Sequence, residues 1–232
     1  MVLPLYLAIT AQEMDATDDL PASMGWMACH FDPAGPGLRD LPEALPPETM
    51  LILNDRFPCR GHDPQLVLTQ LAEAAKKLSC GGVLLDFERE PDACSRAIAE
   101  ALAVSLPCPV GAPPGFSEKT AVFLPPCPLH IPLADHLRPW RGREIWLEVA
   151  LQQQMVTVTG NGTQLDPAVP ADRQGGTFDE ILLCQCVTEI SEEEVRFILF
   201  DTPETLKRKL KEAARLGASK AVGLYQELGG KL

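Results

Sequence analysis

Short runs of apolar residues alternate with amphipathic helical patterns along most of this chain. Runs bounded by glycine, proline or polar residues predict β-strands at residues 3–10, 25–31, 50–53, 81–89, 108–112, 120–124, 144–151 and 218–225. Helical spacing of apolar residues, with Asp63 and Thr202 as N-cap residues of two of the segments, predicts helices at residues 64–78, 92–106, 133–140 and 203–216. Residues 11–24 are polar and acidic without a helical period, which predicts a loop.

This order of elements predicts an α/β fold in which parallel βα units close into a TIM-like (β/α)8 barrel. We expect one domain over residues 1–232. Such barrels typically have about 250 residues, so we expect some helices to be missing, namely those after the first, second and fifth strands. The alternative is an open doubly wound sheet, but the sequence has no GxGxxG or P-loop motif that would give such a sheet a nucleotide site.

Residues 152–200 interrupt the alternation and predict a β-rich insert before the last helix. Residues 155–165 have the pattern of a hairpin with Gly160-Asn161-Gly162 at its turn. Residues 181–190 and 195–200 flank a polar turn and predict a second hairpin.

The predicted strand at residues 81–89 ends in two carboxylates. Because side chains alternate along a strand, Asp86 and Glu88 point to the same side as Leu84. An apolar wall and a neighbouring like charge both favour the protonated form of a carboxylic acid. A protonated glutamate beside an aspartate is what a general acid for glycosidic cleavage requires. The alternative is that both acids lie on a solvated strand end and pair with Arg89 or a lysine.

This strand resembles glycoside hydrolase family 18, the chitinase family, which carries Asp-Gly-x-Asp-x-Asp-x-Glu at the end of its fourth barrel strand. The residues that match the motif are Gly82, Asp86, Phe87 and Glu88. Gly81 and Leu84 occupy the two positions where the family usually has aspartate.

A second segment, near the C-terminus, resembles the ending of the same family. The family pattern there is an aromatic residue, Asp, Pro-Glu-Ser, a lysine, a glycine and a last strand that finishes at a tryptophan. The corresponding residues here are Phe200, Asp201, Pro203, Glu204, Thr205, Lys209, Gly217 and Tyr225. The segment is most similar to the bacterial spore-germination and cell-wall glycosidases, and many family members carry an extra β-containing subdomain where residues 152–200 lie.

The resemblance implies a role for each matching site residue. Glu88 would protonate the glycosidic oxygen, and Asp86 would orient the 2-acetamido group of the substrate, which attacks the anomeric carbon. This substrate-assisted route is a known exception to the two-carboxylate rule. Tyr225 would be a stacking surface for a sugar ring. Four further polar residues near predicted strand ends are candidates for lining the same pocket, since barrel active sites form at that end: Asp32, Asn54, Asp55 and Glu148.

The composition of the chain limits the classes of partner, location and cofactor that we expect. A net charge of −12 makes nucleic acid an unsuitable partner, and no apolar run reaches the roughly 18 residues that span a membrane. The N-terminal segment lacks a basic region and a small-residue cleavage site, so we expect no signal peptide. The eight cysteines are scattered through apolar segments, which favours reduced thiols and a cytoplasmic location. The four histidines lack metal-ligand spacing, and we expect no metal or other cofactor.

Two functional hypotheses follow. The first is a glycosidase that hydrolyses glycans containing N-acetylglucosamine, of the chitin-oligomer or peptidoglycan type, with Glu88 as the acid. The second is a non-catalytic barrel of the same ancestry that binds a glycan or a protein partner. Leu84 in place of an aspartate motivates the second hypothesis, because it removes an acid that helps to set the charge state of Asp86.

Overall fold

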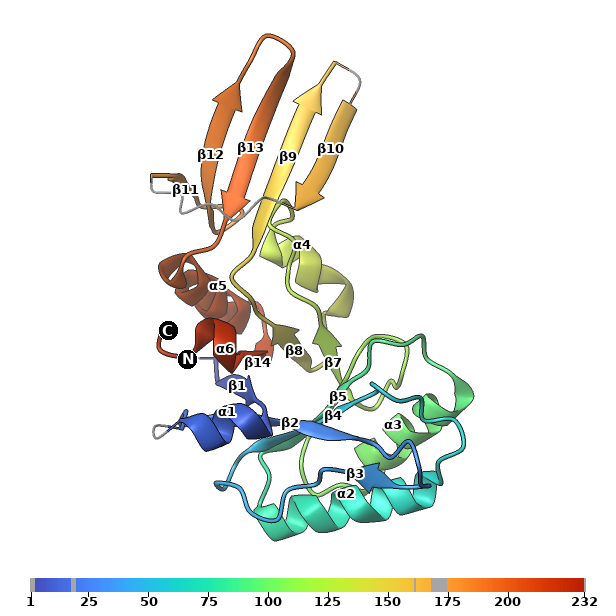
Figure 1. The fold of residues 1–232 in the computed structure, drawn as a ribbon. Coiled ribbons are helices and arrows are strands. Elements are labelled where there is room, and N and C mark those ends of the chain that lie inside the picture. Colours follow the sequence, from blue (N-terminus) through green and yellow to red (C-terminus); the bar gives the residue numbers. More distant parts are fainter. Residues whose placement is uncertain (1–2, 18–19, 161, 168–174, 232) are drawn as a thin grey trace.

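The computed structural model describes residues 3–17, 20–160, 162–167 and 175–231, and its main body is a closed barrel of parallel strands (Figure 1). The barrel strands are β1 (Leu5–Ile9), β2 (Met24–Phe31), β4 (Met50–Asn54), β5 (Gly82–Asp86), β6 (Val110–Ala112), β7 (Ala121–Leu124), β8 (Ile145–Glu148) and β14 (Ala218–Leu224). Their order is β1-β14-β8-β7-β6-β5-β4-β2, and β1 also pairs with β2, which closes the ring. The predicted (β/α)8 barrel is therefore confirmed, and the open doubly wound sheet is excluded.

The helices around the barrel are unequal. Two long helices, α2 (Pro64–Leu78) and α3 (Ala93–Ser105), cover one side, and α5 (Pro203–Arg215) covers the other. Between them lie only short elements, namely β3 (Leu38–Arg39), α4 (Leu133–Leu137), the 3-10 helix η1 (Arg138–Trp140) and α6 (Tyr225–Leu228). None of the helices in the described residues is both long and apolar enough to cross a membrane.

Two local predictions were wrong. The segment after β1 was expected to be a loop, but it contains the helix α1 (Ala11–Ala16). This helix begins with a capping box formed by Thr10 and Glu13. A one-and-a-half-turn helix is too short to show a hydrophobic period, so only its cap could have revealed it. Tyr225 was expected to end the last strand, but it is the first residue of α6.

Apolar side chains fill the barrel lumen. Trp146 on β8 is fully buried in a cluster with residues of five other barrel strands, namely Tyr6, Ala8, Met50, Ile52, Leu84, Ala121, Phe123 and Val222. Its indole ring needs the space of two glycines, since a Cβ atom built on Gly111 would lie 2.3 Å from the ring and one on Gly82 would lie 3.2 Å from it. The lumen is thus a packed core, and only the ends of the strands leave room for polar groups.

A second sheet projects from the barrel (Figure 1). It is antiparallel, with the order β10-β9-β13-β12-β11, formed by β9 (Gln153–Thr159), β10 (Gly162–Pro167), β11 (Thr177–Asp179), β12 (Cys184–Ile190) and β13 (Glu194–Phe200). The two predicted hairpins are β9–β10 and β12–β13, and the sequence did not reveal that β9 and β13 join them into one sheet. Asn161 of the predicted Gly-Asn-Gly turn lies outside the described residues.

A buried ion pair holds the base of this sheet. Lys209 of α5 lies 2.7 Å from the Asp201 carboxylate, which also accepts a hydrogen bond from the hydroxyl of Thr205 at 3.1 Å. The backbone N–H of Asp201 donates to the carbonyl of Gln152 at 2.9 Å, so the chain entering the sheet is tied to the chain leaving it. The residues that resemble the family ending therefore have a structural role here, which is to fix the second sheet on α5.

The lumen packing makes a testable prediction. Gly111→Ala should destabilise the protein by about 1–3 kcal/mol, because its Cβ would overlap the Trp146 ring and force the core to shift. Urea unfolding followed by circular dichroism measures the effect. Gly160→Ala is the control, since no heavy atom lies within 4 Å of its Cβ position, and it should change stability by less than about 1 kcal/mol. Equal stability of Gly111→Ala and the wild-type protein would contradict the packing described.

Candidate active site at the barrel mouth

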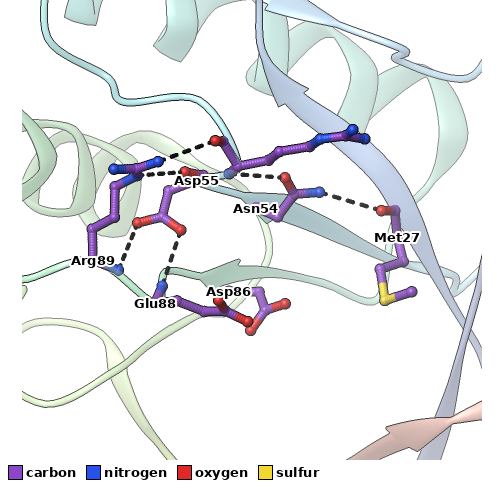
Figure 2. Close-up of a pocket in the computed structure, with 7 residues that line it drawn as sticks. Met27, Asn54, Asp55, Asp86, Glu88 and Arg89 are labelled. Atoms are coloured by element: carbon purple, nitrogen blue, oxygen red, sulfur yellow. Dashed lines mark hydrogen bonds between the residues drawn. The ribbon is translucent and has the colours of Figure 1, made fainter.

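A cavity of about 570 Å³ lies at the C-terminal ends of the barrel strands. The residues that line it are Met27, Asn54, Asp55, Arg56, Asp86, Glu88 and Arg89. They come from the ends of β2, β4 and β5 and from the loops that follow β4 and β5 (Figure 2). Sequence analysis named four of these residues as site candidates. It did not name Met27, Arg56 or Arg89 as lining residues.

Asp86 and Glu88 form the acidic part of the cavity. Figure 2 shows their carboxyl groups lying beside each other, as the alternation of side chains along a strand predicts. Burial, followed by the negative charges of Glu88 and Asp55, raises the pKa of Asp86 to about 6. Glu88 itself is exposed. Asp86 therefore retains a proton in mildly acidic solution.

No cation neutralises this pair. Among the described residues neither Asp86 nor Glu88 forms an ion pair, and the predicted alternative partner Arg89 is directed elsewhere. The Arg89 guanidinium donates to the backbone carbonyls of Asp55 at 2.9 Å and Arg56 at 3.2 Å. An unpaired carboxylate in a half-buried position, such as that of Asp86, is costly, so its presence at the end of an apolar strand beside a second acid indicates a functional role.

Asp55 holds the loop that carries these acids. Its buried carboxylate accepts hydrogen bonds from the backbone N–H groups of Glu88 at 3.0 Å and Arg89 at 2.9 Å. Both oxygens are therefore engaged by the protein, and Asp55 positions the site residues. Asp55 also lines the cavity, so its predicted contact with substrate stays a prediction beside this positioning role.

Asn54 lines the cavity beside Asp86, which is its direct neighbour in the pairing of β4 with β5. Its amide nitrogen donates to the carbonyl of Cys29 at 3.1 Å, and its amide oxygen accepts from the N–H of Arg56 at 3.2 Å. Asp32 lies apart from this cavity, in the turn after β2. There its carboxylate accepts from the N–H of Ala34 at 3.0 Å and lies 3.9 Å from Arg39.

Glu148 ends β8 on the same face as Trp146, so it belongs to the lumen side of the mouth. Burial, followed by the charges of Asp86, Glu88 and Glu227, raises the pKa of Glu148 to about 7. Glu227, which sequence analysis did not single out, accepts a hydrogen bond from the backbone N–H of Leu151. Glu148 has no hydrogen-bond or ion-pair partner among the described residues. The mouth thus holds a second partly buried carboxyl with a raised pKa.

Tyr225 lies on the opposite side of the mouth from Asp86. It follows β14, and β14 is four strands away from β5 around an eight-stranded ring. Its hydroxyl lies 3.2 Å from the hydroxyl of Thr17, and its side chain is not among those that line the cavity. The structure therefore brings together Asp86, Glu88, Asn54 and Asp55, but places Tyr225 and Asp32 outside that group.

Leu84 occupies a position of β5 at which the family 18 motif usually has aspartate. It points into the lumen directly below Asp86 and is 1% exposed in the cluster around Trp146. An aspartate in that position would be surrounded by apolar side chains and the acids above it. Within the described residues, no group of three or more histidine, cysteine, aspartate or glutamate side chains is arranged to hold a metal ion.

The fold and the position of the cavity define the class: a TIM-like barrel with an acidic mouth and a second β-sheet. No protein-family model matches the sequence, and no curated protein matches it. Solved structures share the fold. The Bacillus cereus spore cortex-lytic enzyme SleL is 11% identical, with a TM-score of 0.51 over 95% of this chain and 70% of that one. The Bacillus megaterium enzyme of the same name is 10% identical, with a TM-score of 0.53 over 95% and 70% of the two chains.

A further solved structure is a glycoside hydrolase family 18 N-acetylglucosaminidase from Paenibacillus barengoltzii. It is 10% identical, with a TM-score of 0.42 over 95% of this chain and 94% of that one. At these identities the SleL comparisons show a shared barrel fold. They leave the family and the activity of this chain to be argued from its own residues.

The raised pKa values predict how stability depends on pH. The folded protein binds a proton at Asp86 more tightly than the unfolded chain, whose value is near 3.8. The stability that this carboxyl contributes is fully present below pH 4 and is lost as the pH rises through about 6. The stability that the Glu148 carboxyl contributes is lost as the pH rises through about 7. Asp86→Asn should therefore match the wild-type protein at low pH and exceed it at pH 8 by about 1–3 kcal/mol.

Urea unfolding at a series of pH values measures this difference. The control is Asp15→Asn, on the exposed side of α1, which should keep the wild-type pH dependence. A stability difference between Asp86→Asn and the wild-type protein that stays constant from pH 4 to pH 8 would show that the carboxyl is not desolvated.

Proposed function

We propose that this protein is a glycoside hydrolase that cleaves glycans containing N-acetylglucosamine at the barrel mouth. One observation carries the proposal: two adjacent carboxyl groups, Asp86 and Glu88, lie without a cation in a cavity of about 570 Å³ at the C-terminal end of the strands. Function in barrels of this type is located at that end. The likeness of residues 81–88 to the family 18 motif supports the same assignment, as does the fold shared with two spore cortex-lytic enzymes.

The proposed chemistry uses the two acids in different roles. Glu88, at the open edge of the cavity, donates a proton to the glycosidic oxygen as the bond from that oxygen to the anomeric carbon breaks. The carbonyl oxygen of the substrate's own 2-acetamido group forms the new bond to the anomeric carbon. Ionised Asp86 stabilises the positive charge that develops on this group. Water then attacks the anomeric carbon, the bond from that carbon to the acetamido oxygen breaks, and the water gives a proton to Glu88, which restores the starting state.

The raised pKa of Asp86 sets a condition on this mechanism. The route needs Asp86 ionised, so the rate should fall as the pH drops below about 6. Asp55 contributes by fixing the backbone of Glu88 and Arg89, because a donor displaced by about 1 Å loses much of its effect.

A non-catalytic barrel that binds a glycan or a protein partner is the second candidate function. The observation that favours it is Leu84, which fills the lumen where the family usually places a third acid. In this case the cavity would bind a sugar through Asn54, Asp86 and Glu88 without cleaving it.

Hydrolysis of a chromogenic chitobiose substrate tests the proposal. Glu88→Gln keeps the shape of the side chain but removes the proton donor, so kcat should fall about 10²- to 10⁴-fold. Asp86→Asn should also reduce kcat, because the acetamido group loses its orienting charge.

Glu73→Gln, on the exposed face of α2, is the matched control and should retain wild-type activity. Wild-type protein that turns over no N-acetylglucosamine oligomer but binds one would support the binding barrel. Wild-type protein that neither cleaves nor binds these oligomers would contradict both candidates.

A further inference from the structure

Two cysteines lie against each other beside the barrel mouth. Cys59 belongs to the connection between β4 and α2, and Cys94 belongs to the first turn of α3. The Cys94 thiol donates to the backbone carbonyl of Cys59 at 3.2 Å. The Cys59 thiol donates to the carboxylate of Asp92, the N-cap of α3 and two residues before Cys94, at 3.7 Å. The two cysteine side chains are therefore neighbours although 34 residues separate them in the chain, and the interaction with Cys94 contributes to the raised pKa of the Cys59 thiol.

This contact is specific to one pair. All eight cysteines are free. Cys108 contributes to the raised pKa of Cys80, and Cys186 to that of Cys184, but within the part of the chain that the structure describes neither pair has a thiol hydrogen-bonded to the backbone of the other cysteine, as Cys94 is to Cys59. The thiols of Cys29 and Cys127 are buried without a cysteine neighbour among the described residues.

We propose that Cys59 and Cys94 are a disulfide-forming pair, which a low-molecular-weight disulfide such as oxidised glutathione converts to an intramolecular bond. The thiolate of Cys94, the more exposed of the two, attacks one sulfur of the oxidant and releases the other as a thiol. The Cys59 thiol then loses its proton to solvent and attacks the mixed disulfide. A second thiol leaves, so two protein thiols are oxidised while one disulfide is reduced to two thiols.

The order of these steps follows from the surroundings of Cys59. Its side chain is 5% exposed, and burial, the hydrogen bond with Cys94 and the negative charge of Asp92 all raise the pKa of its thiol. A dissolved oxidant therefore reaches Cys94 first, and Cys59 completes the bond because it is already in contact with Cys94.

A disulfide between Cys59 and Cys94 would affect the cavity because of where the two cysteines lie. Cys59 lies four residues after Asp55, and Cys94 lies five residues after Arg89. A disulfide here would join the same two loops that the Asp55 carboxylate joins through the N–H groups of Glu88 and Arg89. Oxidation would therefore fix the wall of the cavity covalently. This inference is independent of the activity proposed for the site.

The experiment incubates native protein with oxidised glutathione and maps the products by peptide mass spectrometry without reduction. The expected product is a Cys59–Cys94 link, with six of the eight thiols still free after denaturation. Cys59→Ser should stop at a glutathione adduct on Cys94, and Cys94→Ser should give no link. Cys108→Ser is the control and should form the link normally. A stable adduct on wild-type Cys94, or a link that joins other cysteines, would overturn the proposal.

Thermal unfolding provides a second readout that needs no activity. The link closes a long loop of the unfolded chain, so oxidised wild-type protein should melt roughly 5–10 °C above the reduced form. In Asp55→Asn, which weakens the loop contact, oxidation should recover part of the lost melting temperature. A link that forms but leaves the melting temperature unchanged or lower would show that the native loops do not accept the bond.

Discussion

The filling of the barrel lumen is the constraint on which the rest of this structure depends. A closed ring of parallel strands encloses a space that side chains must occupy, and here Trp146 and the apolar side chains around it fill that space. The ring fits only because Gly82 and Gly111 have no side chains opposite it. With apolar groups filling the middle of the lumen, carboxyl groups lie at its ends. Glu144 accepts a hydrogen bond from the Trp146 indole at the N-terminal end of β8, and Asp86 and Glu148 at the C-terminal mouth are partly buried and both have raised pKa values.

Two polar contacts then turn this barrel into a scaffold for a site. The Asp55 carboxylate ties the loop after β5 to the end of β4, which fixes the backbone of Glu88. On the other side of the molecule, the buried pair of Asp201 and Lys209 ties the second sheet to α5. Removing either partner of a buried pair leaves an uncompensated charge, so such contacts tolerate little change. The acids of the mouth differ from these, because they lack partners and their cost is not offset within the protein.

Much of the fold could be predicted from the sequence, because strands and long helices have strong hydrophobic periods. The caps of α2 and α5, Asp63 and Thr202, marked the starts of those helices correctly. The pairing of β9 with β13 could not be predicted, since no local signal records which hairpins join. Helix α1 was missed because its capping box was the one clue to it.

The site was predictable in part for a similar reason. The period of two along a strand predicted that Asp86 and Glu88 point to the same side. The carboxyl groups do lie beside each other, although β5 ends at Asp86 and Glu88 belongs to the loop that Asp55 holds. The roles of Asp55 and Tyr225 depend on long-range contacts, with the loop after β5 and with Thr17, which no local pattern records. The raised pKa of Glu148 likewise arises from charges on other elements.

The central claim is that the mouth formed by β4 and β5 binds a glycan containing N-acetylglucosamine. To test this claim, ¹⁵N-labelled wild-type protein is titrated with chitotetraose and the amide chemical shifts are recorded. The Glu88→Gln variant is titrated in parallel, so that binding is measured even if the wild-type protein cleaves the sugar. The account predicts the largest shifts at the amides of Glu88 and Arg89, whose N–H groups bind Asp55, and at Asn54. Shifts confined to the second sheet, or no shifts at millimolar sugar, would contradict it.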